Sequence, residues 1–370
     1  MIKIVEVSSD TNIGGAGKCL LNFLKEFDRN QFDVEVVLPY NSLLKPEIDA
    51  LGIKVNEVYG IADKSLDFGA VGRLRRLFKT IKPDIVHTHA SMSARFAAKL
   101  AGIKIVYTRH SVFEPSPKIS RGPGKWINGM VNNHTSSRII AVAEAAKENL
   151  VQTGVNPAKI DVILNGVNPV KKISGDELPA MRERFGIKDG EKVISIIARL
   201  EDIKGHEYFI DAADMILKKG IKAKFVIAGT GSYENILKDK VNSMGLSDDI
   251  IFTGFIPDVD RLLNITHIQV NASYGTEATS LALLEGMSLG IPAVVSDFGG
   301  NPGVIKDGRN GFIVPKQNAE PLAEKLEELL SNNDLWKKLS AGAEKMFYEE
   351  FTAKAMTSKM EELYKKVMKA

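Results

Sequence analysis

Short runs rich in valine and isoleucine alternate with longer segments of helical spacing along almost the whole chain. The first runs read MIKIVEVSS, DVEVVLP, IKVNEV, DIVHTH, KIVYTRH and RIIAVA, and most are bounded by polar turn residues. Short apolar runs of this kind are typical of strands that are buried on both faces of a parallel sheet. Their alternation with helical segments predicts a doubly wound α/β fold.

The alternation is interrupted over residues 165–179. That segment reads NGVNPVKKISGDELP, concentrates Gly, Pro and Lys, and has no periodicity, as expected of a linker. A second series then follows as EKVISIIARL, AKFVIAGTG, DIIFTGF, HIQVNAS and IPAVVSD. A chain of 370 residues is longer than a single domain with one hydrophobic core usually is. We therefore expect two tandem Rossmann-like domains, over residues 1–170 and 171–349, facing a central cleft.

Composition excludes several classes of protein. The net charge of +3 gives no support for a nucleic-acid footprint across the whole surface. Cys19 is the single cysteine, which excludes an intramolecular disulfide and a Cys-rich metal site. The N-terminal sequence lacks the pattern of a signal peptide, and no run approaches the ~18–20 apolar residues of a membrane span. We expect a cytoplasmic protein for which a membrane is at most a surface partner.

The first strand is followed by a glycine-rich turn, SSDTNIGGAGKCLLNF. Gly14, Gly15 and Gly17 stand between a strand and a helix, where a phosphate can approach bare backbone N–H groups. The spacing is not that of a dinucleotide fingerprint, and no acidic residue follows VVLPY to hold a ribose, which counts against NAD. A plain tight turn remains the alternative.

Two cations follow the first strand of the second series, in IARLEDIKGHEYFIDA. Arg199 lies at the carboxyl end of that strand, and Lys204 stands just before a helix. Such a pair suits a diphosphate and can neutralise the charge that grows on a leaving phosphate. The alternative is a pair of solvated loop cations. Gly229 and Gly231, after the next strand, again allow close approach of a ligand.

Two glutamates occur in EATSLALLEG. A helix is expected from about Thr279 or Ser280, so that Glu285 lies in its second turn and Glu277 precedes it. The N–H groups of Thr279, Ser280 and Leu281 would then be free to bind an anion or hydroxyls. A buried carboxylate needs partners, which ribose and sugar hydroxyls can supply. The alternatives are charge complementarity at the helix start and an ordinary ion pair.

Other features have a second interpretation as well. His87 and His89 point to one side of a strand, but no third ligand stands nearby, so we expect no metal. A helix over residues 69–82 has an apolar face and several arginines, which fits a solvated surface or a contact with anionic lipid. The basic, Pro-rich loop over residues 111–126 is interpreted as an acceptor loop.

The second half resembles family 4 of the retaining glycosyltransferases, which have the two-domain GT-B architecture. Besides the pair of glutamates, the matching segments are ARLEDIKG, AGTG, FTGFIPD, GMSLGIPAVVSDFGGNPGVI and DGRNGFIVP. The first half matches in GGAG, KPDIVHTH, TRHS, AVAEAAKENL and NGV. The resemblance covers nearly the whole chain. It implies that a C-terminal helix, at about residues 350–370, crosses back to the first domain, which would bind the acceptor.

The resemblance implies a role for each matching residue. Glu277 would face the donor sugar, and Glu285 would bind the ribose hydroxyls. Arg199 and Lys204 would hold the diphosphate, and His110 would lie near the reacting carbon. The remaining donor contacts would come from Gly15, Gly231, Phe255, Thr279, Ser280 and Leu281.

The activity that the resemblance implies is transfer of a sugar from a nucleotide diphosphate to an acceptor hydroxyl, with retention and without metal or other cofactor. UDP is favoured and GDP is possible, with a lipid-linked saccharide as acceptor in cell-envelope polysaccharide synthesis. Many members have Gly-Phe-Gly after the first glutamate, where this chain has Ala278-Thr279-Ser280, so the sugar pocket differs. A nucleotide-sugar epimerase of the same architecture and an NAD-dependent oxidoreductase are the alternatives.

Overall fold

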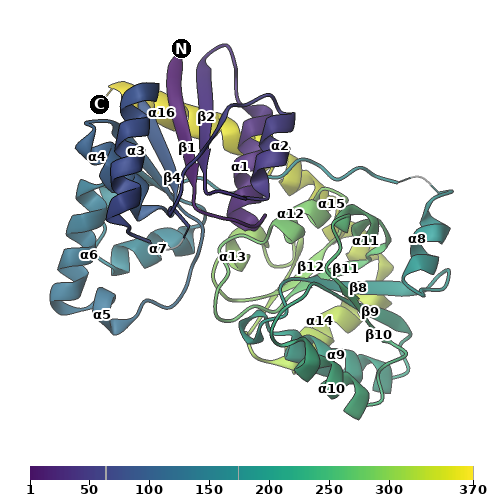
Figure 1. The fold of residues 1–370 in the computed structure, drawn as a ribbon. Helices are drawn as coiled ribbons and strands as arrows, with labels where there is room; N and C mark the ends of the chain where they lie inside the picture. The colour runs from purple at the N-terminus through teal and green to yellow at the C-terminus, as the bar shows by residue number, and fades with distance from the viewer. Residues whose placement is uncertain (63–64, 174, 370) are drawn as a thin grey trace. The chain divides into compact units, whose positions relative to one another are not determined.

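The computed structural model describes residues 1–62, 65–173 and 175–369 (Figure 1). The chain divides into two compact units, of which the first comprises Met1–Val167 together with Ala353–Ala370. The second unit comprises Asn168–Thr352. The unit boundaries thus fall after residues 167 and 352, compared with the expected residues 170 and 349.

The first unit contains a seven-stranded parallel sheet with the strand order β3-β2-β1-β4-β5-β6-β7. All six sequence runs predicted as strands there begin and end within a few residues of observed strands, and the short β7 was not expected. The strands are β1 (Ile2–Ser8), β2 (Phe32–Leu38), β3 (Val55–Glu57), β4 (Ile85–His89), β5 (Lys104–Arg109), β6 (Arg138–Ala141) and β7 (Ile160–Val162).

Helices cover both faces of this sheet. One face packs its apolar side chains against α1, α2 and α16, and the opposite face packs against α3 and α4. Alternation along β1 places Ile4 and Glu6 on the α1 and α16 face, while Val5 and Val7 belong to the other core. The helices are α1 (Gly15–Glu26), α2 (Leu44–Ala50), α3 (Phe68–Ile81), α4 (Met92–Leu100), α5 (Pro117–Ser120), α6 (Gly122–His134), α7 (Glu144–Gln152), the short η1 (Pro157–Lys159) and α16 (Ala353–Lys369).

The C-terminal helix α16 is part of the first unit although nearly 190 residues of chain separate it from Val167. Its apolar positions, among them Met356, Met360 and Tyr364, enter the same core as α1. The Tyr364 ring makes edge contacts with Phe23 and Phe32, at centroid distances of 6.0 and 6.1 Å. The helix therefore closes one face of the first sheet.

The second unit contains a six-stranded parallel sheet with the order β10-β9-β8-β11-β12-β13. Its strands are β8 (Lys192–Ile197), β9 (Ala223–Ala228), β10 (Ile250–Gly254), β11 (Ile268–Asn271), β12 (Ala293–Ser296) and β13 (Gly311–Val314). Its helices are α8 (Leu178–Arg184), η2 (Asp202–Lys204), α9 (His206–Lys218), α10 (Glu234–Ser243), α11 (Val259–Ile265), α12 (Leu281–Met287), α13 (Asn301–Val304), α14 (Ala319–Ser331) and α15 (Asn333–Glu350).

Both sheets confirm the expected doubly wound α/β class, and each has one point where the strand order reverses. The reversal lies between β1 and β4 in the first unit and between β8 and β11 in the second. Connections leave these neighbouring strands toward opposite sides, so the space beyond their carboxyl ends stays open to ligands. Within the described ranges, no helix combines the length and the apolar character needed to cross a membrane.

Tyr364→Ala should destabilise the first unit by about 3–5 kcal/mol, because it removes a fully buried aromatic side chain from the α16 interface. The control is Glu362→Ala on the exposed side of the same helix, which should change the stability by less than about 0.5 kcal/mol. Urea unfolding followed by circular dichroism measures both. Equal midpoints for the two variants would contradict the role of α16 in this core.

Candidate active site

The second unit brings two predicted residues together at its strand reversal. Lys204 ends η2, which follows β8, and Glu277 lies in the loop that follows β11. β8 and β11 are parallel neighbours, with Ile196 opposite Val270, so both loops leave the same edge of the sheet. The side chains of Lys204 and Glu277 are only 12% and 10% exposed, and their N···O distance is 3.0 Å.

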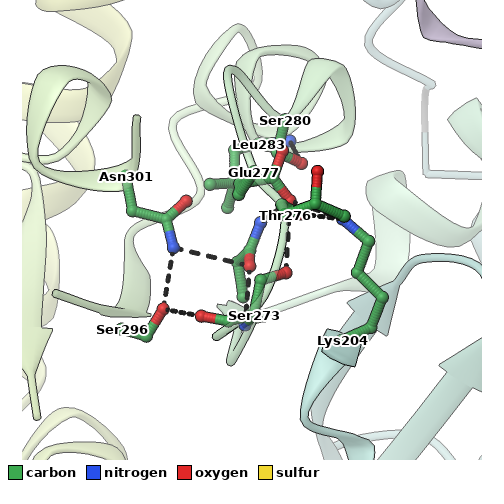
Figure 2. A network of polar contacts seen from close by, with 9 residues as sticks. Lys204, Ser273, Thr276, Glu277, Ser280, Leu283, Ser296 and Asn301 are labelled. Atoms are coloured by element: carbon green, nitrogen blue, oxygen red, sulfur yellow. Dashed lines mark hydrogen bonds and ion pairs between the residues drawn. The ribbon is translucent and has the colours of Figure 1, made fainter. Parts of the chain in front are cut away.

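Glu277 is held in a polar network (Figure 2). Lys204 Nζ donates to Glu277 Oε2 at 3.0 Å and to the Thr276 carbonyl at 2.8 Å. Asn271 Nδ2 and Ser273 Oγ each lie 3.2 Å from the same Oε2. All three contacts with the carboxylate end on Oε2, and Oε1 has no hydrogen-bond partner among the described residues. That oxygen is therefore available to a ligand hydroxyl.

A second layer of hydrogen bonds orients this network. Asn301 Nδ2 donates to Ser296 Oγ at 3.0 Å, and Ser296 Oγ donates to the Ser273 carbonyl at 2.5 Å. Asn271 Oδ1 accepts the Ser273 N–H at 3.1 Å. None of these four residues was predicted from the sequence. Three of them stand at or just beyond the ends of β11 and β12, so polar residues at strand ends were the signal that could have found them.

The backbone around Glu277 is close-packed. Gly300 N donates to the Glu277 carbonyl at 3.1 Å. The preceding Gly299 has φ +61°, and a Cβ there would lie 2.1 Å from the same carbonyl oxygen. Glycine is therefore required at residue 299 by both its conformation and its surroundings. Tyr274 N also donates to the Ile203 carbonyl at 2.9 Å, which joins the loops that carry Glu277 and Lys204.

A buried histidine adjoins Lys204 and was not predicted from the sequence as part of the site. His206 begins α9, is 1% exposed, and has no hydrogen-bond partner for either ring nitrogen among the described residues. Burial, followed by the charge of Lys204, lowers the pKa of His206 to about 4. The ring is therefore neutral at physiological pH and adds no second buried cation beside Lys204.

The other predicted donor residues of this unit follow β8, β9 and β10 at the same edge. Arg199 is exposed, and its guanidinium makes no hydrogen bond or ion pair with any described residue. Phe255 is 75% exposed beyond the end of β10. A Cβ at Gly231 would lie 2.2 Å from the Leu200 carbonyl oxygen. Packing within the unit thus already requires glycine at 231, and its expected donor contact stays a prediction.

The helix after Glu277 begins where the sequence indicated. Ser280 is the N-cap of α12, and its hydroxyl accepts the Leu283 N–H at 3.4 Å. Thr279 is partly exposed, and Leu281 is the first residue of the helix. Glu285 lies in the second turn, as expected, and is half-buried. Its role toward ribose stays a prediction.

The first unit contains the remaining two predicted residues. Gly15 is the exposed first residue of α1, and a Cβ at Gly14 or Gly15 would meet nothing within 4 Å. Packing therefore does not explain these glycines, in contrast to Gly17, where a Cβ would lie 2.9 Å from the Leu44 side chain. His110 follows β5, and its Nε2 lies 2.7 Å from Nδ1 of His89, which ends β4.

The expectation that His87 and His89 have no third ligand nearby is wrong. Glu6, on the adjacent strand β1, brings a carboxylate within 3.1 Å of His87 Nδ1 and 2.9 Å of His89 Nε2. One ligand atom from each residue could meet around a metal ion. The sequence contained the signal, because Glu6 is the single acidic residue of MIKIVEVSS and stands between two valines.

Glu6 is ionised although it is fully buried. Burial alone would raise the pKa of its carboxyl group, but electrostatic attraction and hydrogen bonds from His87 and His89 outweigh this effect and lower the pKa to about 2. Burial lowers the pKa of His87, and together with the neighbouring imidazoles it lowers that of His110 well below its usual value. The cluster thus combines an anionic carboxylate with the neutral imidazoles of His87 and His110.

Two family models match the chain, one for each half. The model of glycosyltransferase family 4 matches residues 13–171, and that of the glycosyl transferases group 1 matches residues 179–346. An uncharacterized glycosyltransferase of Methanocaldococcus jannaschii is 30% identical over 78% of this chain and 76% of its own. The UDP-Gal:alpha-D-GlcNAc-diphosphoundecaprenol alpha-1,3-galactosyltransferase of Escherichia coli is 29% identical over 85% of this chain and 84% of its own.

Solved structures show the same fold. Anabaena HepE, crystallised with UDP-glucose, aligns with a TM-score of 0.86 at 20% identity, over 99% of this chain and all of the other. The fold, the two family models and the M. jannaschii relative agree with the resemblance described from the motifs. The chain is therefore a glycosyltransferase of the GT-B fold and belongs to family 4.

Proposed function

We propose that the protein transfers a sugar from a UDP-sugar to a hydroxyl of a lipid-linked saccharide, with retention of configuration and without a metal ion. It would work at the cytoplasmic face of a membrane, in polysaccharide synthesis. The observation that carries the proposal is the Lys204–Glu277 pair at the strand reversal of the second unit, with Arg199 exposed at the same edge. A GDP-sugar is the alternative donor.

The two cations suit the departure of a nucleoside diphosphate. The bond between the anomeric carbon and the phosphate oxygen breaks, and negative charge accumulates on that oxygen. Arg199 has no partner among the described residues, and Lys204 is fixed by a carboxylate and a carbonyl oxygen. Fixed cations in a partly buried site stabilise such charge strongly. They would fill the place that a metal ion takes in other phosphate sites.

Glu277 is better suited to bind the donor sugar than to attack it. Its Oε2 accepts three hydrogen bonds, which reduce the nucleophilicity of the carboxylate, while Oε1 remains for a sugar hydroxyl. Retention would then arise when the acceptor oxygen bonds to the anomeric carbon on the face that the phosphate leaves. The proton of the acceptor hydroxyl passes to the departing phosphate oxygen. Glu285 would bind the ribose hydroxyls.

Two observations support a lipid-linked acceptor. The name of the E. coli relative gives alpha-D-GlcNAc-diphosphoundecaprenol as its acceptor, and α5 and α6 of this chain expose apolar side chains. Trp126, Ile127 and Met130 on α6 are 68%, 51% and 41% exposed. A loop was expected over residues 111–126, but much of this segment belongs to α5 and to the start of α6. Pro117 and Pro123 do not prevent these helices, because each lies in a first turn, where proline is tolerated.

The charge around these apolar side chains complements an anionic membrane. Lys118, Arg121 and Lys125 are exposed, and residues 115–143 contain no Asp or Glu. Aromatic and basic side chains together are typical of helices that bind at the membrane interface. The arginine-rich α3 remains a second candidate, although its Arg73 bonds the Tyr59 carbonyl at 3.0 Å and lies 3.6 Å from Asp67.

A UDP-sugar should raise the melting temperature more than GDP-sugars, ADP or NAD do, without added metal. A ligand at 100 times its Kd adds about 2.7 kcal/mol to the free energy of unfolding. Glu285→Ala should lose this shift, because the ribose loses its carboxylate. The control is Glu327→Ala, a half-buried helical glutamate that pairs with Lys219. An unchanged shift in Glu285→Ala would overturn the ribose assignment. Conversion of the donor without acceptor would indicate an epimerase.

Lys204→Met should lower kcat about 10²–10³-fold, the usual effect of removing one group that stabilises charge in the transition state. Lys224→Met is the matched control. Lys224 Nζ likewise donates to one backbone carbonyl and one carboxylate, at 2.7 and 2.8 Å. It stands near the start of β9, at the opposite edge of the same sheet. Equal losses of kcat in steady-state assays of the two variants would contradict the assignment of Lys204.

Vesicles that contain anionic phosphatidylglycerol should shift the emission of exposed Trp126 to the blue, and neutral phosphatidylcholine vesicles should not. The second tryptophan, Trp336, donates to the His267 carbonyl at 2.9 Å and stacks on the His267 ring, so its emission should stay constant. Ile127→Asp should abolish the shift. If Arg75→Gln/Arg76→Gln abolishes co-sedimentation and Ile127→Asp does not, the membrane surface is α3 instead.

A further inference from the structure

A chain of three buried or partly buried groups leads to His110 from the middle of the first sheet. Glu6 on β1 is fully buried, His89 at the end of β4 is 5% exposed, and His110 follows β5. Glu6 Oε2 lies 2.9 Å from His89 Nε2, and His89 Nδ1 lies 2.7 Å from His110 Nε2. The three strands are consecutive neighbours in the sheet, so the chain of hydrogen bonds runs across the strand reversal.

Donors and acceptors can be assigned along this chain one proton at a time. An ionised carboxylate only accepts, so His89 Nε2 must carry a hydrogen and donate to Glu6. In a neutral imidazole the other nitrogen then accepts. His89 Nδ1 therefore accepts from His110 Nε2, which must carry the hydrogen of that ring. Nδ1 of His110 is left unprotonated.

The rest of the cluster is consistent with this assignment and needs no charged imidazole. Tyr364 donates to Glu6 Oε1 at 2.9 Å and accepts from His87 Nδ1 at 2.7 Å. His87 Nε2 then accepts from Thr108 Oγ1 at 2.7 Å. Every N–H and O–H group that this assignment uses then has an acceptor, and the Glu6 carboxylate accepts hydrogen bonds on both of its oxygens.

We propose that Glu6 and His89 are positioning residues, which hold His110 as the tautomer with its proton on Nε2 and present an unprotonated Nδ1 to the substrates. The proposal deepens the proposed function, because it rests on the role of His110 beside the reacting carbon. His110 then accepts a hydrogen bond from a sugar or acceptor hydroxyl and cannot donate one from Nδ1. Glu6 stabilises the charge that His110 gains whenever it draws that proton toward itself.

The surroundings make this hydrogen-bond chain strong. The rings of His89 and His110 lie with centroids 5.0 Å apart and planes tilted by 25°, so they meet edge to edge as an N–H···N bond requires. A small cavity of about 20 Å³ beside them is lined mainly by apolar side chains, including Phe23, Ile140 and Met356. Hydrogen bonds in such low-dielectric surroundings are stronger than in water.

A metal ion bound by Glu6, His87 and His89 would produce the opposite tautomer. His89 Nε2 would then be a ligand without hydrogen, and its Nδ1–H would donate to His110 Nε2. The hydrogen of His110 would move to Nδ1. The same inversion follows if His89 is an imidazolium. The tautomer of His110 therefore distinguishes the proposal from both alternatives.

The first test is long-range ¹H–¹⁵N NMR on the full chain with ¹⁵N-labelled histidine, without ligand and with metal content measured. The chain has six histidines, and His110→Gln assigns the signal of interest. The expected result is a neutral His110 protonated at Nε2. A signal for the Nδ1–H tautomer, or bound metal that inverts it, overturns the proposal. This measurement needs no activity, so it stays valid if the UDP-sugar assignment fails in the thermal-shift panel.

Variants then separate positioning from structural support. His89→Phe should shift the His110 signal away from the pure Nε2–H tautomer and lower kcat about 10²-fold or more, with an unchanged KM for the donor. Thr108→Val removes one buried hydrogen bond of the same cluster but leaves the chain from Glu6 to His110 intact, so it should change neither readout. Glu6→Gln, whose amide oxygen still accepts from His89, should retain the tautomer. Equal effects of His89→Phe and Thr108→Val on kcat and on the NMR signal would overturn the proposal.

Discussion

Parallel pairing of the strands is the constraint on which the rest of this structure depends. In both sheets every strand runs in the same direction, and the order of the strands reverses once. All carboxyl ends therefore meet at one edge, and loops from β8 and β11 become neighbours although about 70 residues separate Lys204 from Glu277. The first unit repeats the arrangement, with His89 and the end of β1 on either side of its reversal. The polar cluster of each unit therefore lies at the strand reversal, where the crossover connections leave in opposite directions.

Buried charge determines how each of these sites is built. A carboxylate that leaves water must receive hydrogen bonds or a cation, since its desolvation is otherwise strongly unfavourable. Glu277 receives an ammonium, an amide and a hydroxyl on one oxygen, and its other oxygen remains available to a ligand. Glu6 receives imidazole and phenol donors on both of its oxygens. The two carboxylates thus differ in their surroundings: one oxygen of Glu277 has no partner among the described residues, whereas both oxygens of Glu6 have partners.

The sequence predicted the strands well wherever they are central in the sheet, because burial on both faces produces uninterrupted apolar runs. It missed β7 and β13, which are edge strands of three and four residues, although it predicted the equally short edge strand β3. The start of α12 was predicted near Thr279 or Ser280, and Ser280 is the N-cap in the structure, a residue type that is typical before an apolar helical run. Glycines were harder to interpret. Gly231 is needed for close packing on Leu200, whereas a Cβ at Gly15 would contact no atom of the described residues. The sequence alone does not distinguish a glycine required by packing from one that is not.

The sequence by itself determined the class of fold, the division into two units and the residue types available for diphosphate and sugar binding, because these depend on local periodicity and on motifs within a few residues. Only the tertiary structure decided which side chains meet. The bonds from Lys204 to Glu277 and from Glu6 to Tyr364 join residues 73 and 358 positions apart. Such pairs depend on strand order and on the face to which each side chain points. A local sequence pattern contains neither kind of information. Strand order depends on how the crossover connections pack, and the burial of a polar side chain depends on which distant segment covers it.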